Sequence, residues 1–518
     1  MLAVAIASLG AVAISFTAVA QDLASPTPLV LAAIGSPRVL PDRLLGANAE
    51  PWYNDLVTDP TKKAILAGMH LGFTRFPGGS LANYYDWKRG LILITGYPNS
   101  SAYTNYWVGL AAWCDAKFPT GVFIEQYKPF SDALGAEVVM VPNLETASVS
   151  DQVAWFAQLA AEGIVPTHIE MGNEFWVAMG GDPNVEAHWP DEPTTMAITQ
   201  QYADGFRPYL PANAKVAVQA APGAIWIGPS PKGAFWDRLR HWNDDLHPEP
   251  WFDAVTTHLY PRLEDATGDP NANHEAVTPA LALRNFEALM GVHDDCANAT
   301  LTDLESRVPG KEIWITEWNG RSGGDWQSGK THPITPAIVL HTVTRMLLTC
   351  LQHPSVTMSL YFQLNFLNNL QTAFVPGGSG YAPLPATEVF GWFCQAANGG
   401  ATWQQLVEPG ATRLPGNGAQ PWTYAGIEGA LFRGASGMTV IVQNATPDAR
   451  STDLTQLASG VLPSKVETIS GPDLTVTPLL AAVVTSVTPS LDVTLPPYSV
   501  TRLTWPASPH RIRRHLAE

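Results

Sequence analysis

Eight short apolar runs between residues 44 and 366 constrain the fold most strongly, because stretches of helical character separate several of them. Strands that are buried on both faces and alternate with helices are typical of parallel sheets. Eight of them predict an α/β fold of the (β/α)8, or TIM, barrel type, with functional side chains at the carboxyl ends of the strands. The runs are LLGANAE (44–50), GFTRFPGG (72–79), AEVVMVPNLET (136–146), THIEMGNE (167–174), KVAVQAAP (215–222), FDAVTTHLYP (252–261), EIWITEWN (312–319) and VTMSLYFQLN (356–365).

Two of the intervening segments carry clear helix signals. After the third run, Ser148 precedes an apolar periodic stretch with Asp151 three residues further on, and Gly163 follows as a stop signal. After the seventh run, Thr335 and Pro336 open a long apolar segment that ends before Pro354. Helices in these places are what a barrel requires between successive strands.

Beyond about residue 400 the pattern changes to short alternating segments such as GMTVIVQN, VTPLLAAVV and PPYSVTRLTW, which predict antiparallel strands of a C-terminal β-sandwich. Residues 2–20 carry no charge and end in Ala-Val-Ala, so they predict a secretory signal, with an uncleaved membrane anchor as the alternative. The expected organisation is 1–20 signal peptide, 21–41 a strand joining the sandwich, 42–400 barrel, 401–506 sandwich and 507–518 disordered tail.

Charge and cysteine content narrow the class of partner. A net charge of -17 and a pI near 5.1 argue against nucleic acid or an anionic membrane as partner. We therefore expect a secreted protein, extracellular or periplasmic, whose oligomeric state the sequence leaves open. Its four cysteines allow one or two disulfides or free buried thiols. No motif for a metal or an organic cofactor is present, so none is expected.

Two glutamates carry the strongest chemical signal. Glu174 in IEMGNEFW and Glu317 in IWITEWNG each end an apolar run of strand length, 143 residues apart. A single glutamate of this kind could close a strand at the surface, but a buried carboxylate without a partner is costly, and two of them suggest a shared pocket. Paired carboxylates are the chemistry of glycoside hydrolysis, so an oligo- or polysaccharide is the expected substrate.

Further polar side chains lie at the ends of the predicted strands. Arg75 and Tyr260 can donate hydrogen bonds to a carboxylate that acts as nucleophile, and Asn173 can hold the sugar 2-hydroxyl. Trp87, Trp176 and Trp318 adjoin these clusters, so at least one is expected to stack on a sugar ring. The predicted substrate-binding residues are Glu50, Arg75, Asn143, Asn173, Trp176, His258, Tyr260, Trp318 and Gln363, and Glu145, Asn319 and Asn365 lie in the same row of strand ends.

The motifs GNE and TEWN resemble those of clan A glycoside hydrolases. Within that clan the chain is most similar to family 51, the α-L-arabinofuranosidases, through GANAE (46–50), RFPGGSLANYYDW (75–87), GNEFW (172–176), TEWN (316–319) and QLN (363–365). The resemblance implies a retaining enzyme with Glu174 as acid/base and Glu317 as nucleophile. Ser80 and Thr316 depart from the family pattern, which has Asn and Asp at these places.

Several alternatives stay open at the level of sequence. Families 79, 39, 30 and 44 share the implied architecture, so a β-glucuronidase or heparanase-like enzyme, a β-xylosidase and an endo-β-glucanase remain alternatives for the substrate. A non-catalytic carbohydrate-binding protein is an alternative of another class. The segment GRSGG (320–324) fits a serine nucleophile motif, but Ser322 lies five residues beyond Glu317 and no helix follows at once, as such an elbow requires.

Overall fold

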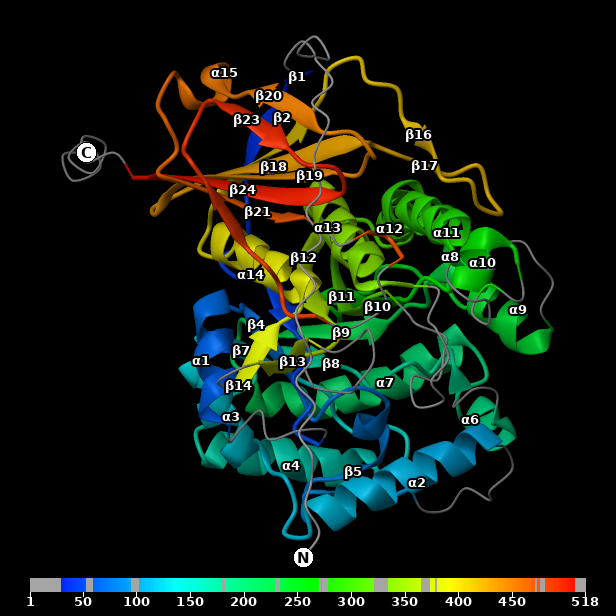
Figure 1. Ribbon diagram of the computed structural model, residues 1–518. Coiled ribbons are helices and arrows are strands. Elements are labelled where there is room, and N and C mark those ends of the chain that lie inside the picture. The colour runs from blue at the N-terminus through cyan, green and yellow to red at the C-terminus, as the bar shows by residue number, and fades with distance from the viewer. Residues whose placement is uncertain are drawn as a thin grey trace, which may run out of the picture.

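The computed structural model describes residues 29–52, 59–94, 102–178, 182–228, 233–269, 272, 278–320, 334–364, 373–377, 380–470, 473–475 and 480–507. Two layers of the fold stand out in Figure 1, with a β-sandwich above a barrel and the helices α13 and α14 between them. The expected signal peptide, the tail from residue 508, Ser322 and Asn365 lie outside the described residues.

Eight parallel strands form the barrel, in the spatial order β3-β12-β11-β10-β9-β8-β7-β4. Each of the eight apolar runs contains one of them, which confirms the predicted (β/α)8 fold. Most of their residues are buried, and polar side chains such as Arg75, Gln219 and Glu317 lie near their carboxyl ends. The strands are β3 (Leu45–Ala47), β4 (Phe73–Phe76), β7 (Glu137–Met140), β8 (His168–Glu170), β9 (Lys215–Gln219), β10 (Ala254–Leu259), β11 (Glu312–Trp318) and β12 (Val356–Tyr361).

The barrel closes where β3 meets β4, and a glycine permits the close approach. A Cβ atom on Gly46 would lie 2.5 Å from the carbonyl oxygen of Phe73. Just beyond, the amide of Gly72 donates to the carbonyl of Leu45 at 2.7 Å. A larger side chain at position 46 would therefore force the first and second strands apart.

Helices cover the barrel, and the two predicted caps are in place. Ser148 accepts a hydrogen bond from the amide of Asp151 at the start of α4 (Val149–Ala161), and Thr335 caps α13 (Pro336–Gln352) in the same way. The other helices are α1 (Pro60–Met69), α2 (Ala102–Lys117), α3 (Ile124–Ala133), α6 (Pro183–His188), α7 (Glu192–Phe206), α8 (Gly223–Ile227), α9 (Ala234–His241), α10 (Leu263–Thr267), α11 (Pro279–Gly291), α12 (Ala297–Arg307), α14 (Pro385–Ala397) and α15 (Thr455–Ala458), with shorter turns η2 (Ser80–Tyr84), η3 (Arg207–Tyr209) and η4 (Val292–Cys296).

A seven-stranded antiparallel sheet and a three-stranded sheet form the sandwich, and strands from residues 29–39 join both. The pairing of β1 with β20 is parallel. The large sheet has the order β2 (Ala32–Val39), β15 (Thr402–Val407), β18 (Ile427–Gly434), β19 (Gly437–Asn444), β24 (Ser499–Pro506), β21 (Lys465–Ser470) and β22 (Thr485–Val487); the small sheet contains β1 (Leu29–Val30), β20 (Arg450–Asp453) and β23 (Asp492–Leu495). The described residues also contain three separate two-stranded sheets: β5 (Tyr85–Asp86) with β6 (Leu91–Ile92), β13 (Phe374–Gly377) with β14 (Gly380–Pro383), and β16 (Leu414–Pro415) with β17 (Thr423–Tyr424).

The prediction of a strand at VTPLLAAVV is wrong for the part of this segment that the structure describes. Its described part, residues 480–484, has no regular secondary structure. The amide of Ala482 donates instead to the carbonyl of Pro383 at 2.8 Å, next to the β13–β14 hairpin. The alternating pattern there serves contact with a neighbouring hairpin rather than a sheet ladder.

A buried ion network fixes the sandwich to the barrel. Arg345 of α13 is fully buried and donates to the carboxylate of Glu428 in β18 and to the carbonyl of Ala425, and it lies 3.3 Å from Asp294 of η4. The ring of Phe393 in α14 packs edge-on against Phe432 in β18, with centroids 6.0 Å apart. Charge pairing and apolar packing together make the two layers one structural unit.

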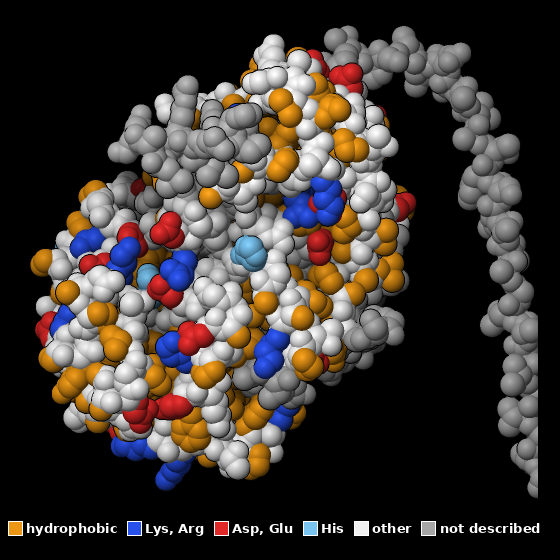
Figure 2. All heavy atoms as spheres, turned by 90° about the vertical axis from the view of Figure 1, so that its left-hand side faces the viewer, with side chains coloured by type: hydrophobic (Ala, Val, Ile, Leu, Met, Phe, Trp, Pro, Cys, Tyr) orange, Lys and Arg blue, Asp and Glu red, His pale blue; other side chains and the backbone are white. Residues whose placement is uncertain are grey.

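The molecular surface and the cysteines complete the picture. On the face drawn in Figure 2, acidic and basic side chains are intermingled among apolar ones and form no basic stripe. Cys114, Cys296, Cys350 and Cys394 are all buried free thiols. Within the described part of the chain, every helix is too short or too polar to cross a bilayer.

Candidate active site

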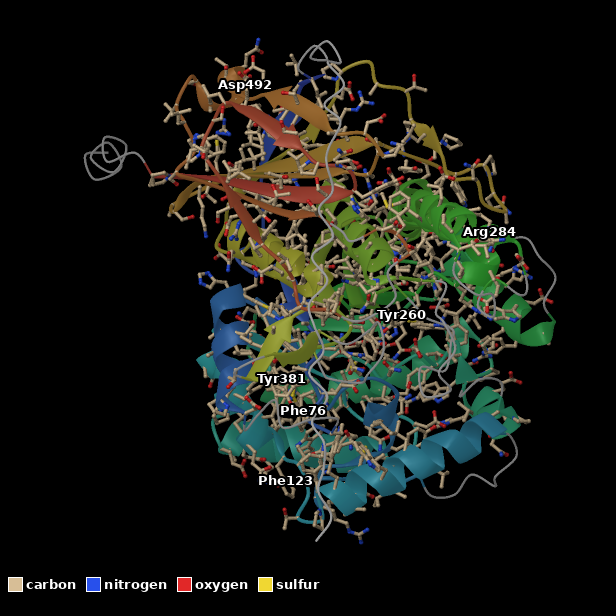
Figure 3. The ribbon with its side chains drawn as sticks, in the orientation of Figure 1. Phe76, Phe123, Tyr260, Arg284, Tyr381 and Asp492 are labelled. Atoms are coloured by element: carbon tan, nitrogen blue, oxygen red, sulfur yellow. The ribbon has the colours of Figure 1, made fainter. Side chains whose placement is uncertain are left out.

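The functional side chains lie at the carboxyl ends of four barrel strands, β4, β8, β10 and β11. Glu174 follows β8, Glu317 is the penultimate residue of β11, and Arg75 lies in β4. Figure 3 marks Tyr260, directly after β10, and Phe76, the last residue of β4, both in the barrel layer. Chain segments far apart in sequence therefore contribute to one site.

A β-bulge sets the direction of two successive side chains in β11. Ile315 pairs with Thr257, but the next pair is Glu317 with His258, so Thr316 is an extra residue in β11. A bulge breaks the alternation of side chains between the two faces of a sheet. Both Thr316 and Glu317 consequently reach groups inside the barrel, where strict alternation would admit one of them.

Glu317 is held by two donors. Arg75 donates from one terminal nitrogen to Oε1, and the hydroxyl of Tyr260 donates to Oε2 at 2.8 Å. Burial lowers the pKa of Arg75, but the negative charges of Glu170 and Glu317 outweigh this and raise it. Burial and the nearby Glu317 charge raise the pKa of Tyr260 well above its ordinary value, so its proton stays available for donation. The two contacts orient the carboxylate and stabilise negative charge on it.

Glu174 is paired with His258. The Nδ1 atom of His258 lies 2.8 Å from Oε1 of Glu174 and 3.7 Å from Oε2 of Glu317. Burial would lower the pKa of His258, but the charge of Glu317 and hydrogen bonds to Glu170 and Glu174 raise it to about 9. At neutral pH the ring is therefore a cation that donates to Glu174.

The backbone around Glu174 is held in an unusual conformation. Glu174 has φ 50, in the left-handed region that side chains other than glycine seldom occupy. The preceding residue, Asn173, exchanges two backbone hydrogen bonds with the side chain of Asn83, at 2.7 and 2.9 Å. Non-glycine residues held in such conformations cluster at functional sites.

Glu170 contacts side chains that hold the two carboxylates and was not among the predicted site residues. Its oxygens accept from Nε and a terminal nitrogen of Arg75 at 2.7 and 2.9 Å and from Thr316 Oγ1 at 2.9 Å. Thr316 Oγ1 also lies 3.0 Å from Nε2 of His258. Burial raises the pKa of Glu170, but the charge of Arg75 and the contact with His258 outweigh it and lower the pKa. This ionised carboxylate thus connects the groups that hold Glu317 and Glu174.

The backbone of Gly78 and Gly79 lies next to the carboxyl groups of both Glu50 and Glu317. The amide of Gly79 donates to Glu50 Oε1 at 2.8 Å, and a Cβ atom on Gly79 would lie 2.7 Å from Glu317 Oε1. Burial and the charge of Glu317 raise the pKa of Glu50 to about 7, against the opposing effects of the Gly79 amide and Arg75. The backbone at Gly78–Gly79 therefore separates the two carboxyl groups where no side chain fits.

The structure brings most, but not all, of the predicted binding residues to the carboxylate pair. Asn173 accepts from Arg75 at 2.7 Å, and its amide nitrogen donates to Ser80 Oγ at 3.3 Å. Gln363 is buried two residues beyond β12. Asn143 accepts from the amides of Glu145 and Thr146 in its own turn, and its side-chain nitrogen donates to the hydroxyl of Thr146 and to the carbonyl of Tyr85. It shapes the loop after β7.

The three tryptophans among which a sugar-stacking ring is expected are closely packed against other side chains. Trp176 and Trp318 are only 2% and 1% exposed. Trp176 packs edge-on against His258, and Trp318 packs against Tyr361 and Phe390 in the barrel layer. Both rings are therefore almost entirely shielded from solvent by their neighbours. Trp87 is less buried, but its indole donates to Asp151 at 3.0 Å and its ring stacks on Trp155.

Oxygen atoms of Glu174 and Glu317 and a ring nitrogen of His258 all lie within 4.8 Å of one another. Such a set could in principle bind a metal ion. His258, however, contacts Glu174 and Thr316 through its two ring nitrogens, and its raised pKa means that a metal would have to displace a proton shared with Glu174. The arrangement suits proton transfer and carboxylate chemistry better than metal binding.

A small hollow opens beside Glu174. Its lining combines polar residues with apolar ones. The residues that line it are Ser80, Asn83, Tyr84, Asn173, Glu174, Phe175, Val177 and Val185.

Sequence reasoning missed Glu170, Asn83 and Arg238, which the structure places in or next to the site. The sequence does carry a signal for Glu170, because an acidic residue inside a buried strand needs a charged partner. Asn83 lies in a polar stretch where nothing distinguishes it from its neighbours. Arg238, described below, lies in a helix whose relation to Glu174 is purely tertiary.

Comparison with solved structures identifies proteins that share the fold of this chain. No family model matches the sequence, and no curated protein matches it. Among solved structures, the family 51 arabinofuranosidase from Xanthomonas axonopodis pv. citri aligns with a TM-score of 0.61 at 16% identity, over 90% of this chain and 97% of that one. The family 51 α-L-arabinofuranosidase AbfB from Bifidobacterium longum aligns with a TM-score of 0.61 at 15% identity, over 93% and 98%.

A structure with a different named activity shares the fold as well. The 4-O-α-L-rhamnosyl-β-D-glucuronidase from Fusarium oxysporum 12S aligns with a TM-score of 0.53 at 12% identity, over 92% of this chain and 100% of that one. These likenesses cover both the barrel and the sandwich. They establish the shared architecture of the chain with these proteins.

Proposed function

We propose that this protein is a glycoside hydrolase that acts with retention of anomeric configuration, with Glu317 as nucleophile and Glu174 as general acid/base. The observation that carries the proposal is the proximity of the two carboxyl groups, whose nearest oxygens lie within 4.8 Å. Retaining enzymes place the groups about 5 to 5.5 Å apart, whereas inverting enzymes need about 6.5 to 9.5 Å to admit a water molecule. The different partners of the two carboxylates support the division of roles.

In the first step, an oxygen of Glu317 forms a bond to the anomeric carbon while the bond from that carbon to the leaving oxygen breaks. Glu174 transfers its proton to the leaving oxygen. In the second step, a water oxygen attacks the anomeric carbon, the bond to Glu317 breaks, and Glu174 takes the proton of the water. Arg75 and Tyr260 hold Glu317 for attack, and His258 donates to Glu174 in its ionised form.

The sugar we propose is an α-L-arabinofuranoside. The family 51 motifs in the sequence and the fold shared with two family 51 enzymes support this choice. Asn173 donates one amide hydrogen to Ser80, which leaves the other for a sugar hydroxyl. The two cations that contact the carboxylate pair, Arg75 and His258, are both matched by carboxylates. A uronic acid would bring a further negative charge, so a neutral sugar fits better.

We further propose that the protein is secreted. The support is the uncharged segment 2–20 with its Ala-Val-Ala ending, together with a substrate class that is found outside cells. N-terminal sequencing of the protein from the culture medium of its host would test this, with cleavage after residue 20 expected.

A panel of nitrophenyl glycosides tests the activity. Arabinofuranoside, xyloside, glucuronide, galactoside and glucoside are compared under one set of conditions, and hydrolysis of the arabinofuranoside is expected to be fastest. Glu317→Ala should lose turnover on every substrate, since no covalent intermediate can form. Glu174→Ala should keep turnover only on substrates with good leaving groups and should be rescued by azide. Sugar binding without hydrolysis of any glycoside would favour a non-catalytic carbohydrate-binding protein.

A further inference from the structure

An arginine outside the carboxylate cluster contacts the chain on either side of the loop that follows β8. Arg238 lies in α9 (Ala234–His241) and is partly buried. Its Nε donates to the carbonyl of Trp176 at 3.1 Å, and its terminal nitrogens donate to the carbonyls of Phe175 at 3.0 Å, of Pro190 at 2.6 Å and of Trp189. Four of the five donor hydrogens of the guanidinium are thus directed at backbone carbonyls.

These four carbonyls belong to two segments that converge beside Glu174. Phe175 and Trp176 directly follow Glu174, while Trp189 and Pro190 follow α6 (Pro183–His188). The rings of Phe175 and Trp189 are stacked with centroids 3.8 Å apart, so the two segments are in direct contact. The guanidinium also lies over the ring of Trp242, 4.5 Å from its centroid. Arg238 therefore ties both segments to α9.

We propose that Arg238 is a positioning residue for Glu174, acting through the backbone of residues 175 and 176. Glu174 is in the left-handed region at φ 50, a conformation that persists only when surrounding contacts enforce it. Asn83 holds the residue before Glu174, and Arg238 holds the two residues after it. Lysine cannot replace Arg238, because a single ammonium group cannot reach four carbonyls that the planar guanidinium spans.

The inference rests on the proposed function, and its consequence is specific to proton donation. A displaced Glu174 donates its proton poorly, so cleavage of substrates with poor leaving groups suffers while substrates with good leaving groups need little protonation. Simple loss of folded protein would lower both rates by one factor. The dependence of kcat/KM on the leaving-group pKa therefore separates a positioning role from a structural one.

The test compares Arg238→Lys with Arg240→Lys, a matched change on the same helix. Arg240 donates to the carbonyl of Gly228 and to Asp237, away from the residues that follow Glu174. With aryl glycosides of the sugar that the enzyme cleaves best, Arg238→Lys should lower kcat/KM about 10- to 100-fold for poor leaving groups and leave the dinitrophenyl glycoside within about threefold. Arg240→Lys should leave both unchanged. Equal losses across leaving groups in Arg238→Lys would overturn the proposal.

A second measurement needs no substrate. Hydrogen exchange followed by mass spectrometry reports the amides of Val177 and Ala178, which donate to the carbonyls of Glu174 and Phe175. Arg238→Lys should speed their exchange, and Arg240→Lys should not. Unchanged exchange in Arg238→Lys would refute the tether itself. If the wild-type protein cleaves no glycoside, the proposed function fails, while the exchange data still decide whether Arg238 fixes this segment.

Discussion

His258 Nδ1 donates to Oε1 of Glu174 at 2.8 Å, so the group proposed as acid/base is bonded to a buried imidazolium. The same ring contacts Thr316 through Nε2 at 3.0 Å and through it reaches Glu170. A cation in this place favours the ionised form of Glu174, the form required to deprotonate water in the second step of the proposed reaction. Protonation of one histidine thus connects the chemistry of the site with the stability of the fold.

The raised pKa of His258 predicts a loss of stability at alkaline pH. A histidine with a pKa near 6.5 when unfolded and about 9 when folded stabilises the protein fully below about pH 6.5, and this contribution is lost as the pH rises to about 9. The upper limit is about 3 kcal/mol. Urea unfolding at pH 6.5 and 9.5 should show this loss in the wild type and a smaller one in His258→Gln. Equal pH dependence in both proteins would contradict it.

Gly79→Ala should impair catalysis by steric conflict. The added methyl group would lie 2.7 Å from Glu317 Oε1 and 3.3 Å from Glu50 Oε1, so the nucleophile would have to move. We expect kcat/KM to fall about 100-fold, the loss that a displacement of about 1 Å can cause.

Gly68→Ala is the control for this substitution. Position 68 lies inside α1, and no atom approaches a Cβ built there within 4 Å. Alanine should stabilise the helix by about 0.5 to 1 kcal/mol and leave kcat/KM unchanged. Normal activity in Gly79→Ala would show that the carboxylates tolerate displacement.

Glu170→Gln should weaken both halves of the site. Removing this charge takes one ionic partner from Arg75 and disturbs the contact with Thr316, so both Glu317 and His258 lose support. The pKa of His258 should fall as a result, since Glu170 is one of the groups that raise it. Proton NMR titration of His258 would measure this shift. An unchanged pKa would show that Glu170 does not influence the protonation of His258.

Glu428→Ala should destabilise the protein without altering its chemistry. Arg345 is fully buried and would keep Asp294 but lose Glu428, and breaking a buried ion pair from one side costs about 3 to 5 kcal/mol. Asp492→Ala, an exposed position on the sandwich that Figure 3 labels, serves as control and should change the free energy of unfolding by less than about 0.5 kcal/mol. Both variants should keep wild-type kcat when folded; a lower kcat in Glu428→Ala would show that the ion pair also shapes the site.

The barrel is predictable from the sequence because its strands are apolar on both faces and each stops at a polar group. Local signals also predict where two helices begin, because the side chains of Ser148 and Thr335 accept hydrogen bonds from amides three residues further along the chain. The same local logic fails for VTPLLAAVV, because the described residues 480–484 form no strand and Ala482 instead contacts the β13–β14 hairpin.

The details of the site are less predictable, because they depend on pairing between distant segments. The bulge at Thr316 is invisible in the sequence, yet it decides that both Thr316 and Glu317 point inward. Burial of Trp176 and Trp318 follows from packing against His258 and Tyr361, which no spacing reveals. Glutamates at strand ends can be recognised, whereas the residues that hold them can be found only in three dimensions.

The stereochemistry of the first product tests the central claim most directly. Proton NMR, recorded immediately after addition of enzyme to a glycoside that it cleaves, identifies the anomer released before mutarotation. Two displacements at the anomeric carbon, first by Glu317 and then by water, predict the same anomer as in the substrate. Release of the opposite anomer would mean a single displacement and would contradict both the role of Glu317 as nucleophile and that of Glu174 as acid/base.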